Sequence, residues 1–270
     1  MEYALLQAVF LPLLLSPIAY ILGRKMGATV TTWFTFGVLL YCTFLVIQVA
    51  LSGSYEEHYV WTKLFGEFGF KLDGLAIPFA VIIYVLSTVL ALYSKPYMMH
   101  KFHELYEEHV HHSHSSSGQT TAIVESSEMN SYVKNQSGLY FALYLVFAMG
   151  MLGTVLSTNL IEFYVFFEVM LIPGFFLVAF YGDGPRRRIS LMFLFWTHVG
   201  AVVLLLGFLT IGLSIGSFDF TAISEAKIPQ NILMLAAIAI VVGLGVKLAA
   251  FIFHIWLPYV HGAAPTPISA

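Results

Sequence analysis

Two ionisable residues lie within long apolar stretches of this chain: Glu168 in 160-LIEFYVFFEVMLIPGFF-176, and Lys247 after 231-NILMLAAIAIVVGLGV-246. If these stretches cross a membrane, each charge costs about 2.5–3.5 kcal/mol at the helix centre. Such residues normally face the protein interior and mark ion paths or proton relays. Pairing the acid with the base would offset part of this cost and couple their protonation. We therefore predict that Glu168 and Lys247 form a proton-carrying pair, with a purely structural ion pair as the alternative.

The stretch around Lys247 contains residues that interrupt helices. Two glycines precede the lysine and three prolines follow it: Gly243, Gly245, Pro258, Pro265 and Pro267. The glycines weaken the helix, and the prolines exclude a regular helix beyond them. Broken helices in membranes line polar cavities, and in transporters they often mark the ion site. His254 follows Lys247 by two helical turns and would lie near the same face if the helix continued, where its imidazole could pass protons on.

Three further residues are weaker candidates for a relay. Glu162 lies about 9 Å before Glu168 along a helix axis and closer to the membrane interface, which favours an interfacial role. His198 lies in 195-FWTHVGAVVLL-205, where a hydrogen-bonded packing role is favoured over a relay. His261 is expected near the cytoplasmic surface.

The composition indicates which elements must carry these residues. Hydrophobic residues make up 59% of the chain and charged residues 10%, whereas an ordinary soluble domain has about 25% charged residues. Several apolar runs reach about 20 residues, enough to cross a bilayer as a helix, and none alternates like a membrane β-strand. We predict an all-α integral membrane protein with a broken seventh helix and the start of an eighth at 265–270. The spans are expected near 3–22, 29–51, 75–95, 138–157, 159–181, 188–214 and 231–257.

Basic residues are distributed unevenly between the predicted loops. Loops one, three and five hold eight Lys and Arg residues, and loops two, four and six hold three. Because basic loops stay in the cytoplasm, we predict a multi-pass protein of the cell membrane (plasma or inner membrane) with its N-terminus outside. The first apolar run is long enough to be a retained span rather than a signal peptide. Without a basic tract, nucleic acid is not an expected partner, and the single Cys42 excludes an internal disulfide.

The longest predicted loop, 99–137, contains the run 100-HKFHELYEEHVHHSHSSSG-118. Histidine-rich tracts of this kind can bind zinc or nickel. However, the spacing matches no defined site, serines follow at once and no cysteine joins the histidines. We predict a solvated, partly disordered loop and no metal site.

Two stretches in register carry a resemblance to a known family. The stretch 148-AMGMLGTVLSTNLIEFYVFFEVMLIPGFFLVAF-180 resembles span five of the antiporter-like subunits of respiratory NADH:quinone oxidoreductase. The stretch 243-GLGVKLAAFIFHIWLPYVHGAAPTPISA-270 resembles their span seven and the approach to span eight. Within the family, 168-EVMLIP-173 is most similar to subunit M, since subunits L and N usually differ after the acid.

The resemblance implies roles for three residues. The span-five glutamate of the family falls on Glu168, its broken-helix lysine on Lys247, and the histidine of its H-x-W-L-P motif on His254. In the family these groups belong to a chain of charged residues along the membrane midplane, which is thought to couple quinone reduction elsewhere to proton translocation. The resemblance implies no cofactor in this chain, with FMN, iron–sulfur clusters and quinone in other subunits. It also implies neighbouring antiporter-like subunits, other membrane subunits and the lipid bilayer as partners.

We therefore expect a proton-translocating subunit of NADH:quinone oxidoreductase, an enzyme subunit without its own redox centre. Lys247 would be the central proton carrier, Glu168 would control whether it holds its proton, and His254 would pass the proton on. The same motifs occur in subunits of multi-subunit Na⁺/H⁺ antiporters and of membrane-bound hydrogenases, which give the alternative function. A third interpretation is an assembly scaffold, in which these charges serve no transport.

The chain departs from the family in two respects. Family members often have prolines just after the lysine, whereas 248-LAAFIF-253 has none, so a softer helix break is expected. Full members contain two inverted repeats, and this chain ends where the last helix of the first repeat would begin. It is therefore expected to be a fragment, or half of a split subunit with a separately encoded C-terminal half. Residues 1–137 would hold helices one to three and the His-rich loop, and residues 138–270 an incomplete first repeat.

Overall fold

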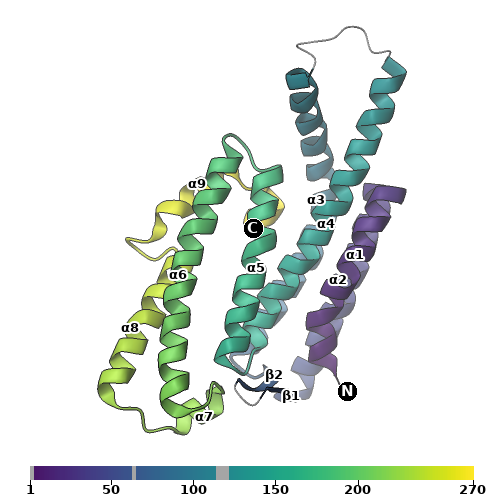
Figure 1. Ribbon diagram of the computed structural model, residues 1–270. Coiled ribbons are helices and arrows are strands. Elements are labelled where there is room, and N and C mark those ends of the chain that lie inside the picture. The colour runs from purple at the N-terminus through teal and green to yellow at the C-terminus, as the bar shows by residue number, and fades with distance from the viewer. Residues whose placement is uncertain (1–2, 63–64, 114–121) are drawn as a thin grey trace.

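A computed structural model describes residues 3–62, 65–113 and 122–270 of the chain. Long helices run up and down through the molecule, and a small hairpin lies at one end (Figure 1). Within the described residues, seven helices are long and apolar enough to cross a membrane. The predicted all-α integral membrane class is therefore confirmed.

The elements follow in a simple order along the chain. The first helices are α1 (Ala4–Met26), α2 (Ala28–Ser52), α3 (Ala76–Ser113) and α4 (Ala122–Leu156), and the strands β1 (Tyr55–Thr62) and β2 (Gly66–Leu72) lie between α2 and α3. The later helices are α5 (Leu160–Tyr181), α6 (Arg186–Ile215), the short α7 (Phe220–Glu225) and α8 (Gln230–Lys247). A 3-10 turn at His254–Trp256 precedes the short helices α9 (Leu257–Ala263) and α10 (Thr266–Ser269).

Two helices are much longer than the spans predicted for them. Helix α3 has 38 residues and α4 has 35, whereas about 20 residues cross a bilayer. Both continue side by side past the end of α1 (Figure 1). The predicted loop 99–137 is therefore wrong for most of its length, although residues 114–121 lie outside the described residues. The polar extension of α3 is supported by pairs one turn apart, such as Lys101 Nζ with Glu104 Oε2 at 2.9 Å.

Buried apolar side chains form two main clusters, one among α1–α4, β2 and part of α5, and one among α5, α6 and α8. Glycines bring the helices of each group close together. A Cβ on Gly23 of α1 would lie 2.2 Å from Gly138 Cα of α4, and a Cβ on Gly243 of α8 would lie 2.7 Å from the Gly200 carbonyl oxygen of α6. Small residues allow such close contact between membrane helices. The domain boundary predicted at 137–138 falls inside α4, and this division of the chain stays a prediction.

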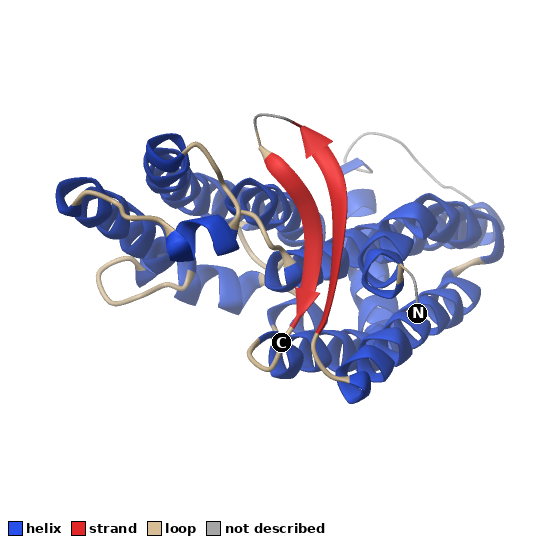
Figure 2. Cartoon of the chain, turned by 90° about the horizontal axis from the view of Figure 1, so that it is seen from below, coloured by secondary structure: helices blue, strands red, loops and turns tan. Residues whose placement is uncertain are grey.

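The segment between α2 and α3 forms an antiparallel hairpin, whereas the sequence predicted only a loop there. Seen along the helices from this end, it runs across the middle of the bundle (Figure 2). Its register pairs Glu56 with Lys71 and His58 with Gly69. Because side chains alternate along a strand, Glu56 and His58 share one face, and Glu57 belongs to the opposite face.

The buried face of the hairpin holds the beginning of α1. The carboxylate of Glu57 accepts hydrogen bonds from the backbone N–H groups of Leu5 at 3.1 Å and Leu6 at 3.0 Å. The first N–H groups of a helix have no partner within it, and the helix dipole favours negative charge there. Glu57 therefore caps α1 from a different element of the fold.

Candidate functional site

Glu168 lies near the middle of α5 and points toward α6. Its Oε2 is 3.0 Å from Nδ1 of His198 on α6. Its Oε1 is buried and has no hydrogen-bond partner in the described part of the chain. The His198 side chain is 55% exposed within this chain, so the pair lies at the edge of the bundle with the acid on the inner side. His198, a weak candidate from the sequence, is thus the direct partner of Glu168.

Lys247 ends α8, and its amine lies against Phe167 of α5. Nζ donates a hydrogen bond to the Phe167 carbonyl oxygen at 2.7 Å and lies 3.7 Å from the centre of the Phe167 ring. A carbonyl dipole and an aromatic face both attract a cation. Among the described residues, no carboxylate oxygen lies within 4.0 Å of Nζ. The expected direct pair with Glu168 is therefore not formed, because the acid turns toward α6 while the lysine contacts the preceding residue of α5.

The chain turns sharply after Lys247. Ala249 and Ile252 have positive φ angles of 50° and 85°, which residues other than glycine rarely adopt. The indole N–H of Trp256 donates to the Val246 carbonyl oxygen at 3.0 Å. It joins the Ala249 N–H, which donates to the same oxygen at 3.2 Å, at the end of the helix. The softer break expected from the absence of prolines is therefore wrong.

The glycines before the lysine do not interrupt the helix. Gly243 and Gly245 both lie inside α8. Gly243 instead fits against α6, where a Cβ would also lie 2.7 Å from Leu204 Cβ. Its physical role is close packing of α6 and α8, which fixes the position of the lysine one turn later.

The break separates the two candidate histidines from Lys247. His254 lies in the 3-10 turn rather than on the Lys247 face of a continuous helix, and it is exposed with its ring stacked on Phe251 at 5.9 Å. His261 lies on α9 and is also exposed. The helix does not continue past Lys247, where α8 ends, so the condition under which His254 would lie beside Lys247 is not met.

Glu162 lies in the first turn of α5, where it forms part of a helix cap. The Asn159 side chain accepts a hydrogen bond from Ile161 N at 2.8 Å. Glu162 Oε2 accepts from Thr158 N at 3.2 Å and from Gly69 N of the hairpin at 3.3 Å. This arrangement resembles a capping box, and the sequence 159-NLIE-162 contained its signal, an N-cap residue followed by Glu at the third helical position. Glu162 is 1% exposed, so it is buried within the fold, and the interfacial role expected for it stays a prediction.

The histidine-rich run is only partly described. His100 and His103 lie on α3, the side chains of His109, His111 and His112 are not described, and His114 lies outside the described residues. Within the described part of the chain, no group of three or more His, Cys, Asp or Glu side chains is arranged to hold a metal ion.

Comparison with known proteins places these residues in a family context. Residues 157–270 match the family model described as "NADH:quinone oxidoreductase/Mrp antiporter, TM". This segment contains Glu162, Glu168, His198, Lys247 and His254. It thus includes both intramembrane charges and the helix break.

Relatives and a solved structure extend the similarity over nearly the whole chain. NAD(P)H-quinone oxidoreductase chain 4 1 of Nostoc sp. is 26% identical, covering 98% of this chain and 45% of that protein. A Rhizobium meliloti protein named as part of a probable K⁺/H⁺ antiporter is 30% identical, covering 88% of this chain and 21% of that protein. A chain of respiratory complex I from Thermus thermophilus with bound NADH has a TM-score of 0.72 at 19% identity, covering 98% of this chain and 48% of that one. The chain spans less than half the length of the curated relatives it matches.

Proposed function

We propose that this chain, which over residues 157–270 belongs to the NADH:quinone oxidoreductase/Mrp antiporter transmembrane family, is a proton-translocating membrane subunit of an NADH:quinone oxidoreductase. The observation that carries the proposal is the contact of Lys247 with α5 at the residue beside Glu168. A base and an acid are thereby held at one depth of the bundle, where charge is costly unless it serves ion transfer. The relatives named for quinone oxidoreductase activity support the choice of complex.

Lys247 is the proposed proton carrier. With the amine protonated, its charge is stabilised by the Phe167 carbonyl oxygen and ring and by a negative charge on Glu168. When His198 is protonated, it neutralises Glu168 at 3.0 Å and that support is withdrawn, so Lys247 releases its proton. When His198 is neutral, Glu168 again favours the protonated amine. Glu168 therefore acts as a switch between two bases on different helices.

The residues beyond the break form the proposed continuation of the path. His254 and His261 follow Lys247 on the exposed side of the turn, and histidine exchanges protons near neutral pH. We assign them to the onward transfer of the proton that Lys247 releases. Glu162, at the other end of α5, is assigned to the opposite side of the same path.

The remaining assignments follow from the same proposal. The redox reaction, with its FMN, iron–sulfur clusters and quinone, belongs to other subunits of the complex, and neighbouring antiporter-like subunits are the lateral partners. The chain is a multi-pass protein, which we assign to the cell membrane with its N-terminus outside. Loops one, three and five lie at one end of the bundle and the hairpin at the other (Figure 1), as this topology requires.

The test replaces each charge in the assembled complex. Lys247→Ala and Glu168→Gln are expected to reduce proton translocation and quinone reductase turnover together, because the two are coupled. Assembly is checked by co-purification of the other subunits. An assembled Lys247→Ala complex that translocates protons at the wild-type rate would refute the role of this subunit.

A second candidate function is supported by one specific observation. The antiporter relative of Rhizobium meliloti is 30% identical across 88% of this chain, so membership of a multi-subunit cation/proton antiporter is the alternative. The same alternative includes the matching subunit of a membrane-bound hydrogenase. The subunits that co-purify with this chain distinguish the two functions. Co-purified iron–sulfur and quinone-site subunits support the oxidoreductase, whereas a purely membrane assembly with cation-dependent proton uptake supports the antiporter.

A further inference from the structure

Glu162 has more hydrogen-bonding capacity than its cap uses. Oε2 accepts hydrogen bonds from the two backbone N–H groups of the cap, but Oε1 is buried and has no hydrogen-bond partner among the described residues. A buried charged oxygen without a donor costs more than a protonated carboxyl group in the same place. The cap therefore leaves one oxygen of Glu162 to hold and release a proton.

Thr158 and Gly69 connect Glu162 to the polar face of the hairpin. The backbone N–H of Thr158 donates to Glu162 Oε2 at 3.2 Å, which places the threonine next to the carboxylate. The position that a Cβ on Gly69 would occupy is 2.9 Å from Thr158 Oγ1 and 3.1 Å from His58 Nδ1. Thr158 Oγ1 and His58 Nδ1 are therefore separated by no more than the sum of these two distances. One water molecule can bridge a separation of that size. Because Gly69 has no side chain, nothing of its own separates the threonine from the histidine.

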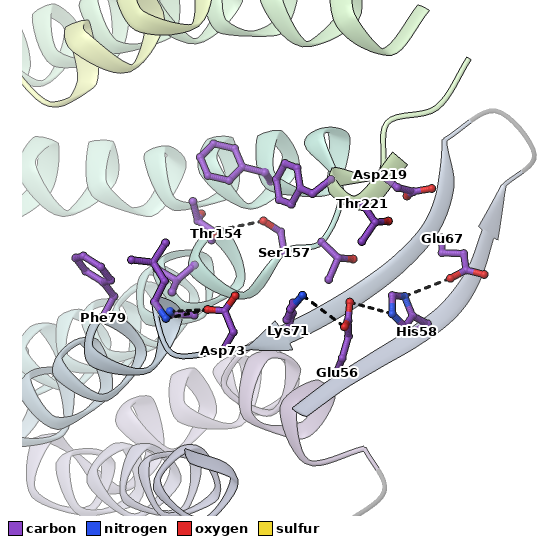
Figure 3. Close-up of a pocket in the computed structure, with 16 residues that line it drawn as sticks. Glu56, His58, Glu67, Lys71, Asp73, Phe79, Thr154, Ser157, Asp219 and Thr221 are labelled. Carbon is purple, nitrogen blue, oxygen red and sulfur yellow. Dashed lines mark hydrogen bonds and ion pairs between the residues drawn. The ribbon is translucent and has the colours of Figure 1, made fainter. Parts of the chain in front are cut away.

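His58 lies between two carboxylates on the outer face of the hairpin. Its Nε2 is 3.0 Å from Glu56 Oε1 and its Nδ1 is 3.2 Å from Glu67 Oε2. Figure 3 shows the three side chains in a row along the hairpin, with Lys71 beside Glu56. The His58 side chain is 45% exposed. Both ring nitrogens therefore have an acceptor for their protons, and the ring is accessible from outside.

The row of charges borders a cavity of ≈ 680 Å³, which Thr158 also lines. The other charged groups on its wall are engaged. Lys71 Nζ lies 3.7 Å from Glu56 Oε2. Asp73 accepts hydrogen bonds from the N–H groups at the start of α3, and Asp219 accepts one from the side-chain amide of Asn159. His58 is thus the ionisable group of this wall that can take a proton from Thr158 and give it to the surface.

We propose that His58, Thr158 and Glu162 form a proton port that opens on the hairpin side of the membrane, with Gly69 as its narrowest point. Protonated Glu162 gives its proton to the Thr158 hydroxyl, which gives its own to a bridging water, and the water protonates His58 at Nδ1. The imidazolium then releases its Nε2 proton to Glu56 and so to bulk water. Glu162 is left as a carboxylate, one proton has left the membrane, and the reverse sequence admits one. The port rests on the proposed function of the chain in proton translocation.

The experiment compares variants of the whole complex in sealed vesicles, with proton translocation and quinone reduction measured at several pH values on the hairpin side. Glu162→Gln keeps the cap, because glutamine also serves at this position of a capping box, but cannot carry the proton. We expect it to lose about tenfold or more of proton translocation. His58→Ala should lose a similar amount, together with the dependence on pH at the hairpin side. Imidazole added on that side should restore flux in His58→Ala and not in Glu162→Gln.

Two further variants separate transport from folding. Gly69→Ala should reduce flux, since its Cβ would stand in the gap. The same Cβ would lie 2.5 Å from the Glu57 carbonyl oxygen, so the hairpin must also shift, and the unfolding temperature is measured beside flux. Glu57→Gln is the matched control, because this buried carboxylate lies on the opposite face of the same hairpin, where it caps α1 and accepts a hydrogen bond from the Tyr59 hydroxyl. Flux per assembled complex should stay at the wild-type level. A loss of flux in Glu57→Gln equal to that in His58→Ala would attribute the effect to a loosened hairpin and overturn the port.

The outcomes also distinguish the port from the proposed function. If Lys247→Ala abolishes translocation while Glu162→Gln or His58→Ala retains it, the port is wrong and the proposed function stands. If Lys247→Ala translocates normally, the proposed function is wrong and the port falls with it. Loss in all three, with imidazole rescue only at position 58, supports both.

Discussion

The close contact between α6 and α8 at Gly200 sets the position of Lys247, and the substitution Gly200→Ala tests this. A Cβ on Gly200 would lie 2.6 Å from Val246 Cβ and 2.8 Å from Val246 Cγ1. Carbon atoms in contact normally stand about 3.5–4.0 Å apart. Because the Val246 Cβ is attached directly to the backbone, α8 must move away from α6 by about 1 Å.

The expected effects on stability and on function differ in size. Overpacking of this kind costs about 1–3 kcal/mol, and alanine regains up to about 1 kcal/mol of helix propensity relative to glycine, so the net loss of stability is modest. Lys247 follows Val246 directly, and a shift of about 1 Å takes its 2.7 Å hydrogen bond with Phe167 beyond normal range. A misplacement of that size costs up to about 100-fold in rate. We therefore expect an assembled complex with a large defect in proton translocation.

The assay measures proton translocation and quinone reduction in vesicles, normalised to assembled complex, together with the thermal unfolding temperature. The matched control is Gly207→Ala on the same helix. A Cβ there would lie 2.9 Å from Ile240 Cγ1, so the same pair of helices is overpacked two turns away from the lysine. It should lower stability to a similar extent and leave flux intact. Wild-type flux in Gly200→Ala, or an equal loss in Gly207→Ala, would refute the positioning of Lys247 by this contact.

Three further substitutions test other contacts. Trp256→Phe removes the indole donor to the Val246 carbonyl oxygen and should lower stability by about 1 kcal/mol; an unchanged unfolding temperature would show that this bond does not hold the helix break. Glu57→Ala removes both acceptors of the α1 N-terminus and should cost about 2–3 kcal/mol, seen as faster amide exchange in the first turn of α1; unchanged exchange there would contradict the cap. Lys101→Met breaks the ion pairs with Glu104 and Asp183 and should cost about 1 kcal/mol or more, because the lysine side chain is buried while its partners are half exposed. Amide hydrogen exchange across residues 100–108 measures this loss of stability. Protection equal to that of the wild type would show that the ion pairs of Lys101 do not stabilise this segment.

The membrane spans were predictable because apolar length alone identifies a crossing helix. The polar extensions of α3 and α4 have no hydropathy signal, and their charged residues are equally compatible with a solvated loop. The hairpin was missed for a different reason. Its signal, aromatic and polar residues alternating over 55-YEEHYVWT-62, lies between the predicted spans 29–51 and 75–95, where only a connecting loop was expected.

The candidate site shows why spacing does not predict partners. The depth of Glu168 and Lys247 follows from their positions in the chain, but which side chains meet depends on the rotation of each helix about its axis. The Gly200–Gly243 contact fixes that rotation for α6 and α8, and neither glycine carries a functional group. The helix break was expected from prolines, yet it begins at Ala249, where the turn is held by Trp256 seven residues later.

The two groups of helices are fastened to each other at both ends of the bundle. At one end the hairpin caps α1 through Glu57 and reaches α5 through Gly69. At the other end Lys101 of α3 is paired with Asp183, in the turn between α5 and α6. In many transporters one group of helices rocks against another as a rigid body. The same motion here would break the contacts at both ends of the bundle at once. Between these two ends α4 and α5 also pack closely against each other. The motion left to the site is therefore rotation of its side chains and flexing of the turn after Lys247.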